Sequence, residues 1–334
     1  MKQLLHILLL LCGLGAFHAC RLVDEDLSDC GTDYQLDYEL RLVTNLTTEL
    51  ETELSLAADV NVSAALREHL RGVFTDRAHD VDLSFYDVVE PLSRLHHEHH
   101  IMDAAQSSYT LYIPVRRYRH LAVANLEDNA CVALKEEDYS NTSVLRQQEA
   151  DTLQPHRTGL FSARLPMDLL DRKDQEFQVR LYMANAAAAA VLDTTGSAVK
   201  DVRVFFRGFA TEFALSDSTY RFRGNPVLRA EKVSVAGDSG TDLCFTTVNF
   251  PSRDTVESKA EEDETLWTVS VYCTRTDGTV TETVLSVKEP LKAGQLKIIR
   301  GQVQKDGSVI PGNMSVGVSV TLDWKAGMEH DVEL

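Results

Sequence analysis

Apolar and polar residues alternate with a period of two along much of this chain. In residues 34–42 the tyrosines and leucines occupy one face, and charged or amide side chains occupy the other. Such alternation is typical of a β-strand with one buried face. Similar patterns predict further strands at 81–86, 109–113, 121–124, 202–206, 244–250 and 296–299.

Turn residues separate the alternating runs in the last third of the chain. Asp277-Gly278 lies between runs at 267–273 and 280–284, and Asp-Gly in that position is a strong hairpin signal. The last alternating row consists of Val316, Val318, Val320, Leu322 and Trp324. Many short strands separated by turns predict a mainly β protein built of antiparallel β-sandwiches.

One or two short helices are expected beside the strands. The first has Ser63 as its N-cap. Its apolar stripe at helical spacing consists of Leu66, Leu70, Val73 and Phe74. A helical turn is expected at 167–170, begun by Pro166. The alanine run 186–190 favours helix by propensity, but its flanks have the pattern of strands, so both states stay open.

The first 19 residues form a hydrophobic leader. Lys2 is their only charge, and an almost entirely apolar run extends from Leu4 to Phe17. This run is shorter than the roughly 20 residues that a membrane-spanning helix needs, and it is typical of a secretory signal peptide. Cleavage between Ala19 and Cys20 would make Cys20 the mature N-terminus.

This arrangement resembles the signal of bacterial lipoproteins, which implies that Cys20 carries acyl chains. Two or more acyl chains hold a protein stably on a membrane. The alternative is an ordinary signal peptide with a chance cysteine. Residues 20–31 are the expected tether. Its acids Asp24, Glu25 and Asp26 are similar to the acidic patch that accompanies surface export in Bacteroides-type bacteria, and they are solvated in either case.

Composition narrows the class of protein and of partner. With 33 Lys and Arg against 51 Asp and Glu, the net charge is −18. This charge argues against nucleic acid, whose phosphates require clustered basic residues. The length after removal of residues 1–19 suggests two domains. The charged run 171–176 is the expected boundary, giving domains at 32–171 and 172–334.

Cysteine use is sparse. Of six cysteines, Cys12 lies in the leader and Cys20 is assigned to lipid. The other four, which allow three pairings, are Cys30, Cys131, Cys244 and Cys273. Export permits disulfides, and a bond between Cys244 and Cys273 is the expected one because these two are closest in sequence. The chain contains no C-x-x-C, which excludes a zinc ribbon or a thioredoxin-like motif.

No catalytic constellation stands out. The histidine cluster at 95–100 offers metal ligands, and His97-Glu98 begins an H-E-x-x-H motif, but Ile101 replaces its second histidine. We expect a solvated loop there, with adventitious metal binding as the alternative. G-D-S-G at 237–240 resembles the nucleophile turn of trypsin-like proteases but lacks its histidine partner motif. We therefore expect no enzyme, no cofactor and no metal site.

The two ends of the mature chain carry a family resemblance. The segments are V-D-E-D-L-S-D-C-G at 23–31, followed by a Tyr/Leu-alternating strand, and the late stretches at 280–303 and 319–334. Together they resemble the fimbrial anchor subunits of Bacteroides-type bacteria, within the fimbrillin superfamily. The resemblance implies two transthyretin-like β-sandwiches in tandem. It also implies a surface-exposed lipoprotein that holds a fimbrium at the outer membrane.

The resemblance also implies other fimbrial subunits as partners, joined when one subunit donates a strand into the groove of the next. The row from Val316 to Trp324 is the candidate exchange strand, and it either completes its own sheet or is donated. Shaft subunits are cut after an arginine, and Arg21 and Arg41 offer such sites. The sequence leaves open whether this subunit lies at the base, in the shaft or at the tip of a fimbrium.

Two other functions compete with the fimbrial one. A glycan-binding surface lipoprotein would present aromatic platforms, whereas Trp267 and Trp324 both fall on apolar strand faces, which favours core positions. A metal-dependent hydrolase would rest on the histidine cluster at 95–100 alone.

Overall fold

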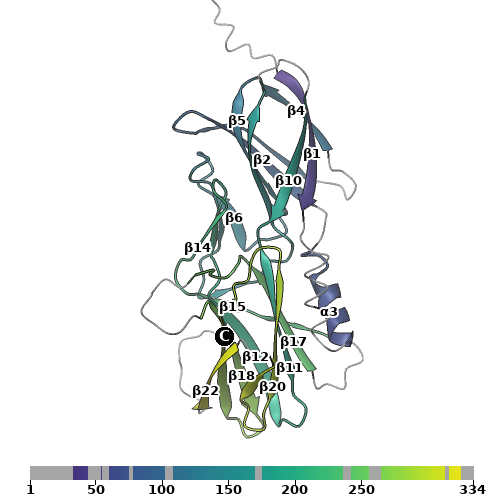
Figure 1. The fold of residues 1–334 in the computed structure, drawn as a ribbon, viewed down its shortest axis with the longest axis vertical. Helices are drawn as coiled ribbons and strands as arrows, with labels where there is room; N and C mark the ends of the chain where they lie inside the picture. Colours follow the sequence, from purple (N-terminus) through teal and green to yellow (C-terminus); the bar gives the residue numbers. More distant parts are fainter. Residues whose placement is uncertain are drawn as a thin grey trace, which may run out of the picture.

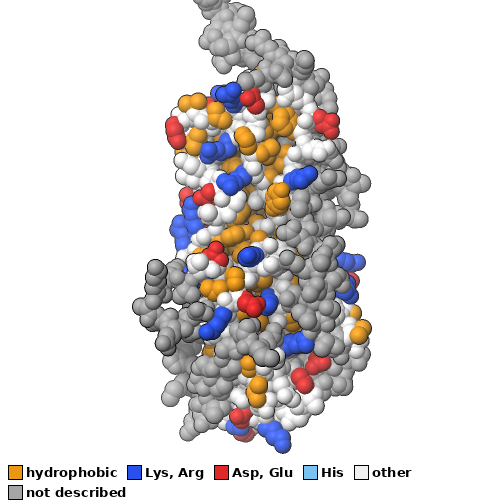
Figure 2. All heavy atoms as spheres, viewed as in Figure 1, with side chains coloured by type: hydrophobic (Ala, Val, Ile, Leu, Met, Phe, Trp, Pro, Cys, Tyr) orange, Lys and Arg blue, Asp and Glu red, His pale blue; other side chains and the backbone are white. Residues whose placement is uncertain are grey.

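The computed structural model describes residues 33–43, 54, 60–74, 78–101, 108–169, 175–235, 242–255, 265–312 and 316–324, with 33–43, 108–109 and 316–324 described by their backbone alone. The molecule is mainly β and elongated, with a seven-stranded sheet and the small sheet that packs on it toward one end and a sandwich of two sheets at the other (Figure 1). Figure 2 shows the same face, where apolar side chains gather along the middle. The predicted fold class is confirmed.

Four sheets contain the strands. The N-terminal sheet has the order β3 (Arg94–Ile101), β2 (Asp80–Asp87), β5 (Arg117–Ala124), β9 (Phe161–Asp168), β10 (Gln175–Met183), β1 (Asp33–Val43) and β4 (Ser108–Pro114). A five-stranded sheet has the order β16 (Glu231–Val233), β17 (Asp242–Asn249), β11 (Ala186–Asp193), β20 (Leu296–Val303) and β21 (Val309–Pro311). A six-stranded sheet has the order β22 (Val316–Trp324), β19 (Val280–Val287), β18 (Trp267–Arg275), β12 (Val199–Arg207), β15 (Val227–Arg229) and β8 (Thr152–Leu153). A small sheet has the order β14 (Thr219–Arg221), β13 (Glu212–Ala214), β7 (Val144–Gln147) and β6 (Val132–Lys135).

The five- and six-stranded sheets form the C-terminal sandwich, and Trp267 lies in its core. The Trp267 side chain is 1% exposed, and its ring centroid lies 6.3 Å from that of Phe206 and 5.5 Å from that of Phe209. Its indole N–H donates to the carbonyl oxygen of Glu289 at 2.8 Å, which satisfies the one polar atom of the ring. The core position predicted for Trp267 is confirmed. The side chain of Trp324 lies outside the described residues.

The helix α3 (Val60–Leu70) packs beside the five-stranded sheet. Its buried residues belong to the same hydrophobic cluster as residues of β11, β17 and β20; they are Val62, Leu66 and Leu70. The predicted apolar stripe is confirmed. The predicted cap is wrong, because α3 begins at Val60 and the Ser63 hydroxyl instead donates to the carbonyl oxygen of Leu54 at 2.6 Å.

The alanine run is a strand, β11, and it is buried on both faces. Ala187 and Ala189 face the cluster that contains α3, while Ala186, Ala188 and Ala190 face the core of the C-terminal sandwich. A strand covered on two sides has little room for large side chains. Tertiary packing therefore outweighs the helix propensity of alanine.

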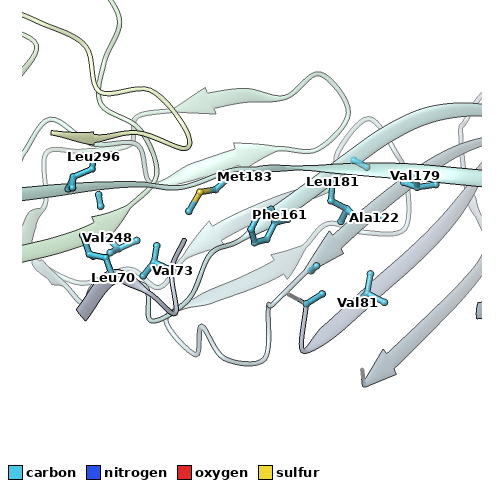
Figure 3. Close-up of a cluster of buried hydrophobic side chains, with 14 of the residues drawn as sticks. Leu70, Val73, Val81, Ala122, Phe161, Val179, Leu181, Met183, Val248 and Leu296 are labelled. Atoms are coloured by element: carbon cyan, nitrogen blue, oxygen red, sulfur yellow. The ribbon is translucent and has the colours of Figure 1, made fainter. Parts of the chain in front are cut away.

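One hydrophobic cluster continues from α3 into the N-terminal sheet (Figure 3). Leu70 of α3 and Leu296 of β20 lie at one end of it, and Phe161, Leu181 and Val81 continue it into the N-terminal sheet. The two halves of the molecule therefore share a core.

The change from one half to the other does not occur in the charged run 171–176. The strand β10 pairs with β1 at eight positions, so Gln175–Met183 belongs to the N-terminal sheet. In the opposite direction, β7 pairs with β13 and β8 pairs with β15. These pairings place residues 144–153 against strands from beyond residue 211, so the ranges 32–171 and 172–334 do not separate the sheets.

Two further expectations are corrected. Residues 167 and 168 end the strand β9 instead of forming a helical turn, because β9 pairs with β5 at eight positions and Pro166 lies opposite Arg119. Cys244 and Cys273 are both free, so the expected disulfide is absent. Cys244 belongs to the cluster under α3 and Cys273 to the sandwich core, which means that they face different layers.

The predicted hairpin at Asp277-Gly278 joins β18 to β19, and Gly278 has a φ of +84°. We expect Gly278→Ala to lower the free energy of unfolding by about 1–2 kcal/mol, because a Cβ is disfavoured in this left-handed conformation. Gly72→Ala is the control, since neither glycine has a neighbour within 4 Å of an added Cβ and only Gly278 has a positive φ. An equal loss in the free energy of unfolding of the two variants, measured by urea denaturation, would contradict the prediction.

Candidate functional site

The residues predicted to hold the protein at a membrane, Cys20 and the acids Asp24, Glu25 and Asp26, lie outside the described residues. The polar loop expected at 237–240 also lies outside them. Within the described part of the chain, no helix is both long enough and apolar enough to cross a membrane. The structure therefore bears mainly on how the folded body can meet other molecules.

The N-terminal sheet is open between β9 and β10. Each of these strands is fully paired on its other side, β9 with β5 and β10 with β1. Between themselves they pair only at Tyr182 with Ser162 and at Met183 with Phe161. The strands then separate, and no other strand of the described chain pairs with either of the two edges. About 20 Å of β9, residues 163–168, faces the gap.

A groove of about 540 Å³ lies between this gap and the β13–β14 hairpin, from which Phe213, Ser218 and Tyr220 also line it. We call it the strand groove. Buried apolar residues of the hydrophobic cluster line it on the inside: Ala163, Val179 and Met183. Exposed residues line it on the outside: Arg164, Gln178, Arg180 and Tyr182. The groove thus offers an apolar floor between two strand edges.

This arrangement suits strand addition. An extended peptide in the groove can form main-chain hydrogen bonds with both edges, and its alternate side chains can reach the apolar floor. Two facing edges without a partner are a ready template for another chain. The groove also explains why β9 tolerates Pro166, since proline within sheets is confined to edges.

The candidate exchange strand, β22, lies at the edge of the six-stranded sheet and pairs with β19 of its own chain. Val316, Val318 and Val320 lie opposite Val287, Leu285 and Thr283. The register then shifts, and Trp324 lies opposite Val280. Thr283 is buried whereas Val280 is partly exposed, so the five residues do not keep one uninterrupted alternation along β19. In this structure β22 completes its own sheet, and its other edge has no partner strand among the described residues.

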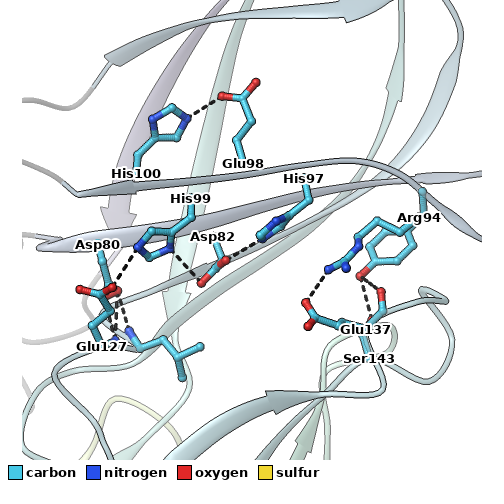
Figure 4. Close-up of polar contacts among 12 residues, drawn as sticks. Asp80, Asp82, Arg94, His97, Glu98, His99, His100, Glu127, Glu137 and Ser143 are labelled. Atoms are coloured by element: carbon cyan, nitrogen blue, oxygen red, sulfur yellow. Dashed lines mark hydrogen bonds and ion pairs between the residues drawn. The ribbon is translucent and has the colours of Figure 1, made fainter.

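The histidine cluster at 95–100 lies on an edge strand, β3, so the expected loop is wrong. Two carboxylates each bind two histidines; Figure 4 shows His97 and His99 on Asp82 and His100 on Glu98. Glu98 contacts the Nε2 atoms of His96 and His100, each at 2.7 Å. Asp82 of β2 contacts His97 Nε2 at 2.7 Å and His99 Nδ1 at 3.4 Å. The strand is hard to see in the sequence because both of its faces carry polar residues.

The contacts of Asp82 with His97 and His99 join β3 to β2, whereas those of Glu98 lie within β3. His99 also contacts Glu127 at 3.1 Å, and the Asp80 carboxylate accepts the backbone N–H groups of Leu126 and Glu127 (Figure 4). Burial raises the pKa of Asp80, while the backbone donors lower it. Among the described residues, no group of three or more His, Cys, Asp or Glu is arranged to hold a metal ion.

Two other histidines, not singled out by the sequence, are fully buried. The ring of His120 stacks on Phe85 at 4.3 Å and its Nδ1 bonds to the carbonyl oxygen of Ser84 at 2.9 Å. His156 Nδ1 lies 3.3 Å from Asn185 Nδ2, so this nitrogen is the acceptor. Burial lowers the pKa of His120 to about 4 and that of His156 to about 3. Both rings are therefore neutral at physiological pH.

Comparison with known proteins agrees with this fold. No protein-family model matches the sequence, and no curated protein matches it. The structure is similar to the fimbrial anchor protein Mfa2 from Porphyromonas gingivalis, with 12% identity, a TM-score of 0.50, and coverage of 86% of this chain and 97% of that one. It is also similar to a candidate adhesin from Bacteroides ovatus, with 12% identity, a TM-score of 0.50, and coverage of 89% and 97%. The chain therefore shares its fold with these two proteins, one of which is a fimbrial anchor protein, and this agrees with the resemblance in its sequence.

Proposed function

We propose that this protein is a lipid-anchored fimbrial subunit, held on the outer membrane through Cys20 and joined to other subunits by strand addition. The strand groove is the observation that carries this proposal, because it presents two strand edges that, beyond their two mutual pairs, have no partner strand in the described chain and that lie above an apolar floor. The protein acts as a structural and binding component and catalyses no reaction. The fold shared with a fimbrial anchor protein supports the same role.

Each end of the chain has a part in this proposal. The lipidated Cys20 fixes the N-terminus, and Asp24, Glu25 and Asp26 start an acidic tether that assists display at the cell surface. The strand groove accepts a strand from a neighbouring subunit. β22, which pairs with one strand only among the described residues, is the strand that can be exchanged.

Cysteine labelling tests the acceptor role of the strand groove. Gln178 is exposed on β10 and lines the groove. In a Gln178→Cys variant we expect a maleimide to react readily with the new thiol in the isolated subunit and at least about ten-fold more slowly in assembled fimbriae. The reason is that an inserted strand covers the groove. Peptide mass spectrometry separates this label from that on native cysteines.

The control is Gln302→Cys, at an exposed position on β20, which is paired on both sides. Its labelling should be the same in the isolated subunit and in fimbriae. Equal labelling of the Gln178→Cys variant in both states would contradict strand addition at this groove. Protection of both variants would indicate general shielding within the fimbrium and would contradict it as well.

A further inference from the structure

The end of the molecule at which β1 begins carries an exposed apolar loop. This loop, residues 88–91, joins β2 to β3, and its sequence is Val-Val-Glu-Pro. All four residues are exposed, Val88 to 47% and Val89 to 66%. A single apolar residue on a surface is ordinary, whereas adjacent ones at the tip of a loop form a small apolar patch that can contact another molecule.

Hydrogen bonds hold the loop in this exposed conformation. The backbone N–H of Val89 donates to Asp87 Oδ1 at 3.0 Å, and the carbonyl oxygen of Val89 accepts the N–H of Leu92 at 2.9 Å. The carbonyl oxygen of Leu92 in turn accepts the N–H of Ser140 at 3.1 Å. The more exposed valine thus has both of its backbone polar groups paired, which lowers the cost of moving it from water into apolar surroundings.

The loop lies close to the point where the chain enters the folded body. Asp33, the first residue of β1, pairs with Pro114 at the end of β4. Two residues later, the guanidinium of Arg116 contacts Asp87 Oδ2 at 3.1 Å, at the base of the loop. β1 begins at the end of the molecule that lies opposite the C-terminal sandwich (Figure 1). The loop and the turn between β4 and β5 therefore form this end, which we call the N-terminal tip.

The proposed lipid anchor keeps the N-terminal tip near a bilayer, and the present inference rests on that anchor. Only residues 21–32 separate Cys20 from Asp33, so the start of β1 lies at most about 45 Å from the acylated residue, whatever conformation they adopt. β1 itself extends about 35 Å away from the tip, and the C-terminal sandwich lies beyond its other end (Figure 1). Of the folded body, the tip is therefore the part that a bilayer meets most readily.

We propose that the lipid-anchored protein stands on its N-terminal tip, with Val88 and Val89 inserted among the headgroups of the membrane lipids. Apolar side chains gain free energy when they reach the boundary between headgroups and acyl chains. Glu90 limits the depth, because a carboxylate is costly in the hydrocarbon. Arg116 and Arg117 are each paired with a carboxylate, so the contact needs no anionic lipid.

Quenching of tryptophan fluorescence by brominated phosphatidylcholine tests the proposal. The lipidated protein, reconstituted into phosphatidylcholine vesicles, carries either Val89→Trp or the control Ile310→Trp, at an exposed position on β21 of the sandwich. Both variants share the background of the native Trp267 and Trp324. Bromine near the headgroups should quench at least about half of the emission that Val89→Trp adds, and little of the emission that Ile310→Trp adds.

A second change separates insertion of the loop from the affinity of tryptophan itself for membranes. Val88→Asp, added to Val89→Trp, should remove at least about half of the quenching, because the new carboxylate opposes insertion of the loop. Equal quenching at positions 89 and 310 would overturn the proposal. Quenching that Val88→Asp leaves unchanged would overturn it as well, since the tryptophan alone would then account for the contact.

Flotation of the same vesicles distinguishes failure of this proposal from failure of the lipid anchor. If the protein floats with the vesicles and Val89→Trp shows no extra quenching, the anchor stands and only the contact of the tip is contradicted. If the wild-type protein fails to float, the anchor is contradicted and this inference falls with it. Labelling at the strand groove does not depend on either result.

Discussion

Lowering the pH from about 7.5 to about 5 should remove about 4 kcal/mol of folding stability through His120 and His156. Both rings are buried, and burial lowers their pKa from 6.5 to about 4 and about 3. Below pH 6.5 each of the two histidines binds a proton in the unfolded chain, whereas the native rings stay neutral. The free energy of unfolding therefore falls as the pH falls, until the native rings are protonated as well. At pH about 5 each ring lowers the free energy of unfolding by about 2 kcal/mol. Together the two rings remove a large part of the 5–15 kcal/mol that is typical of a folded domain.

The many carboxylates titrate in wild type and variants alike. The difference in pH dependence of stability between wild type and variants therefore reports the two histidine rings. Urea denaturation is measured at several pH values for His120→Gln, His156→Gln and the double variant. Each single variant should lose about half of the extra pH dependence, and the double variant nearly all of it. If the stability–pH curves of the wild type and the double variant are parallel, the prediction is contradicted, whatever the absolute stabilities of the two proteins.

Cys20→Ala should transfer the protein from the membrane fraction to the soluble fraction and abolish incorporation of radiolabelled palmitate. Each buried CH₂ of an acyl chain contributes about 0.8 kcal/mol to membrane binding, and two or more chains make anchoring stable. The rest of the chain offers little replacement, because a net charge of −18 does not favour an anionic membrane surface.

The matched control for this experiment is Cys131→Ala, which removes a free, half-buried thiol of the folded body. Its membrane association and palmitate label should equal those of the wild type. A Cys20→Ala protein that stays with the membrane and still carries label would show that Cys20 is not the lipid attachment site.

Local pattern was sufficient for most of the strands. The alternation at 267–273 and 280–284 and the turn between them became β18, its hairpin and β19, since one buried face dictates period two. The apolar stripe with Leu66 and Leu70 predicted the helix α3 equally well. The alanine strand β11 was not, because its state depends on layers that cover both faces. Cys244 and Cys273 show the same limit, since closeness in sequence says nothing of which layer a side chain faces.

The candidate site could not be predicted from local pattern at all. Ala163 and Val179 look like ordinary strand residues, and what makes the strand groove is that β9 and β10 stop pairing after Ser162. The pairing of β10 with β1 across the charged run at 171–176 has the same origin, because a run of local charge does not show which strands pair. The groove lined by Gln147, Glu212 and Asn225 likewise joins segments that lie far apart in the sequence. Pairing between distant segments is tertiary information that a single sequence does not display.

The position of β1 determines how the molecule would carry a load. This strand lies between β10 and β4, with eight parallel and seven antiparallel pairs, and it runs along the long axis of the molecule (Figure 1). A pull transmitted through a membrane-fixed N-terminus acts along the strand, so it loads all of these hydrogen bonds in shear. Under such a load the hydrogen bonds of both strand pairs must break together and not one after another. In the lipid-anchored subunit that we propose, β1, the first strand of the described chain, is therefore the element best placed to withstand tension on the N-terminus.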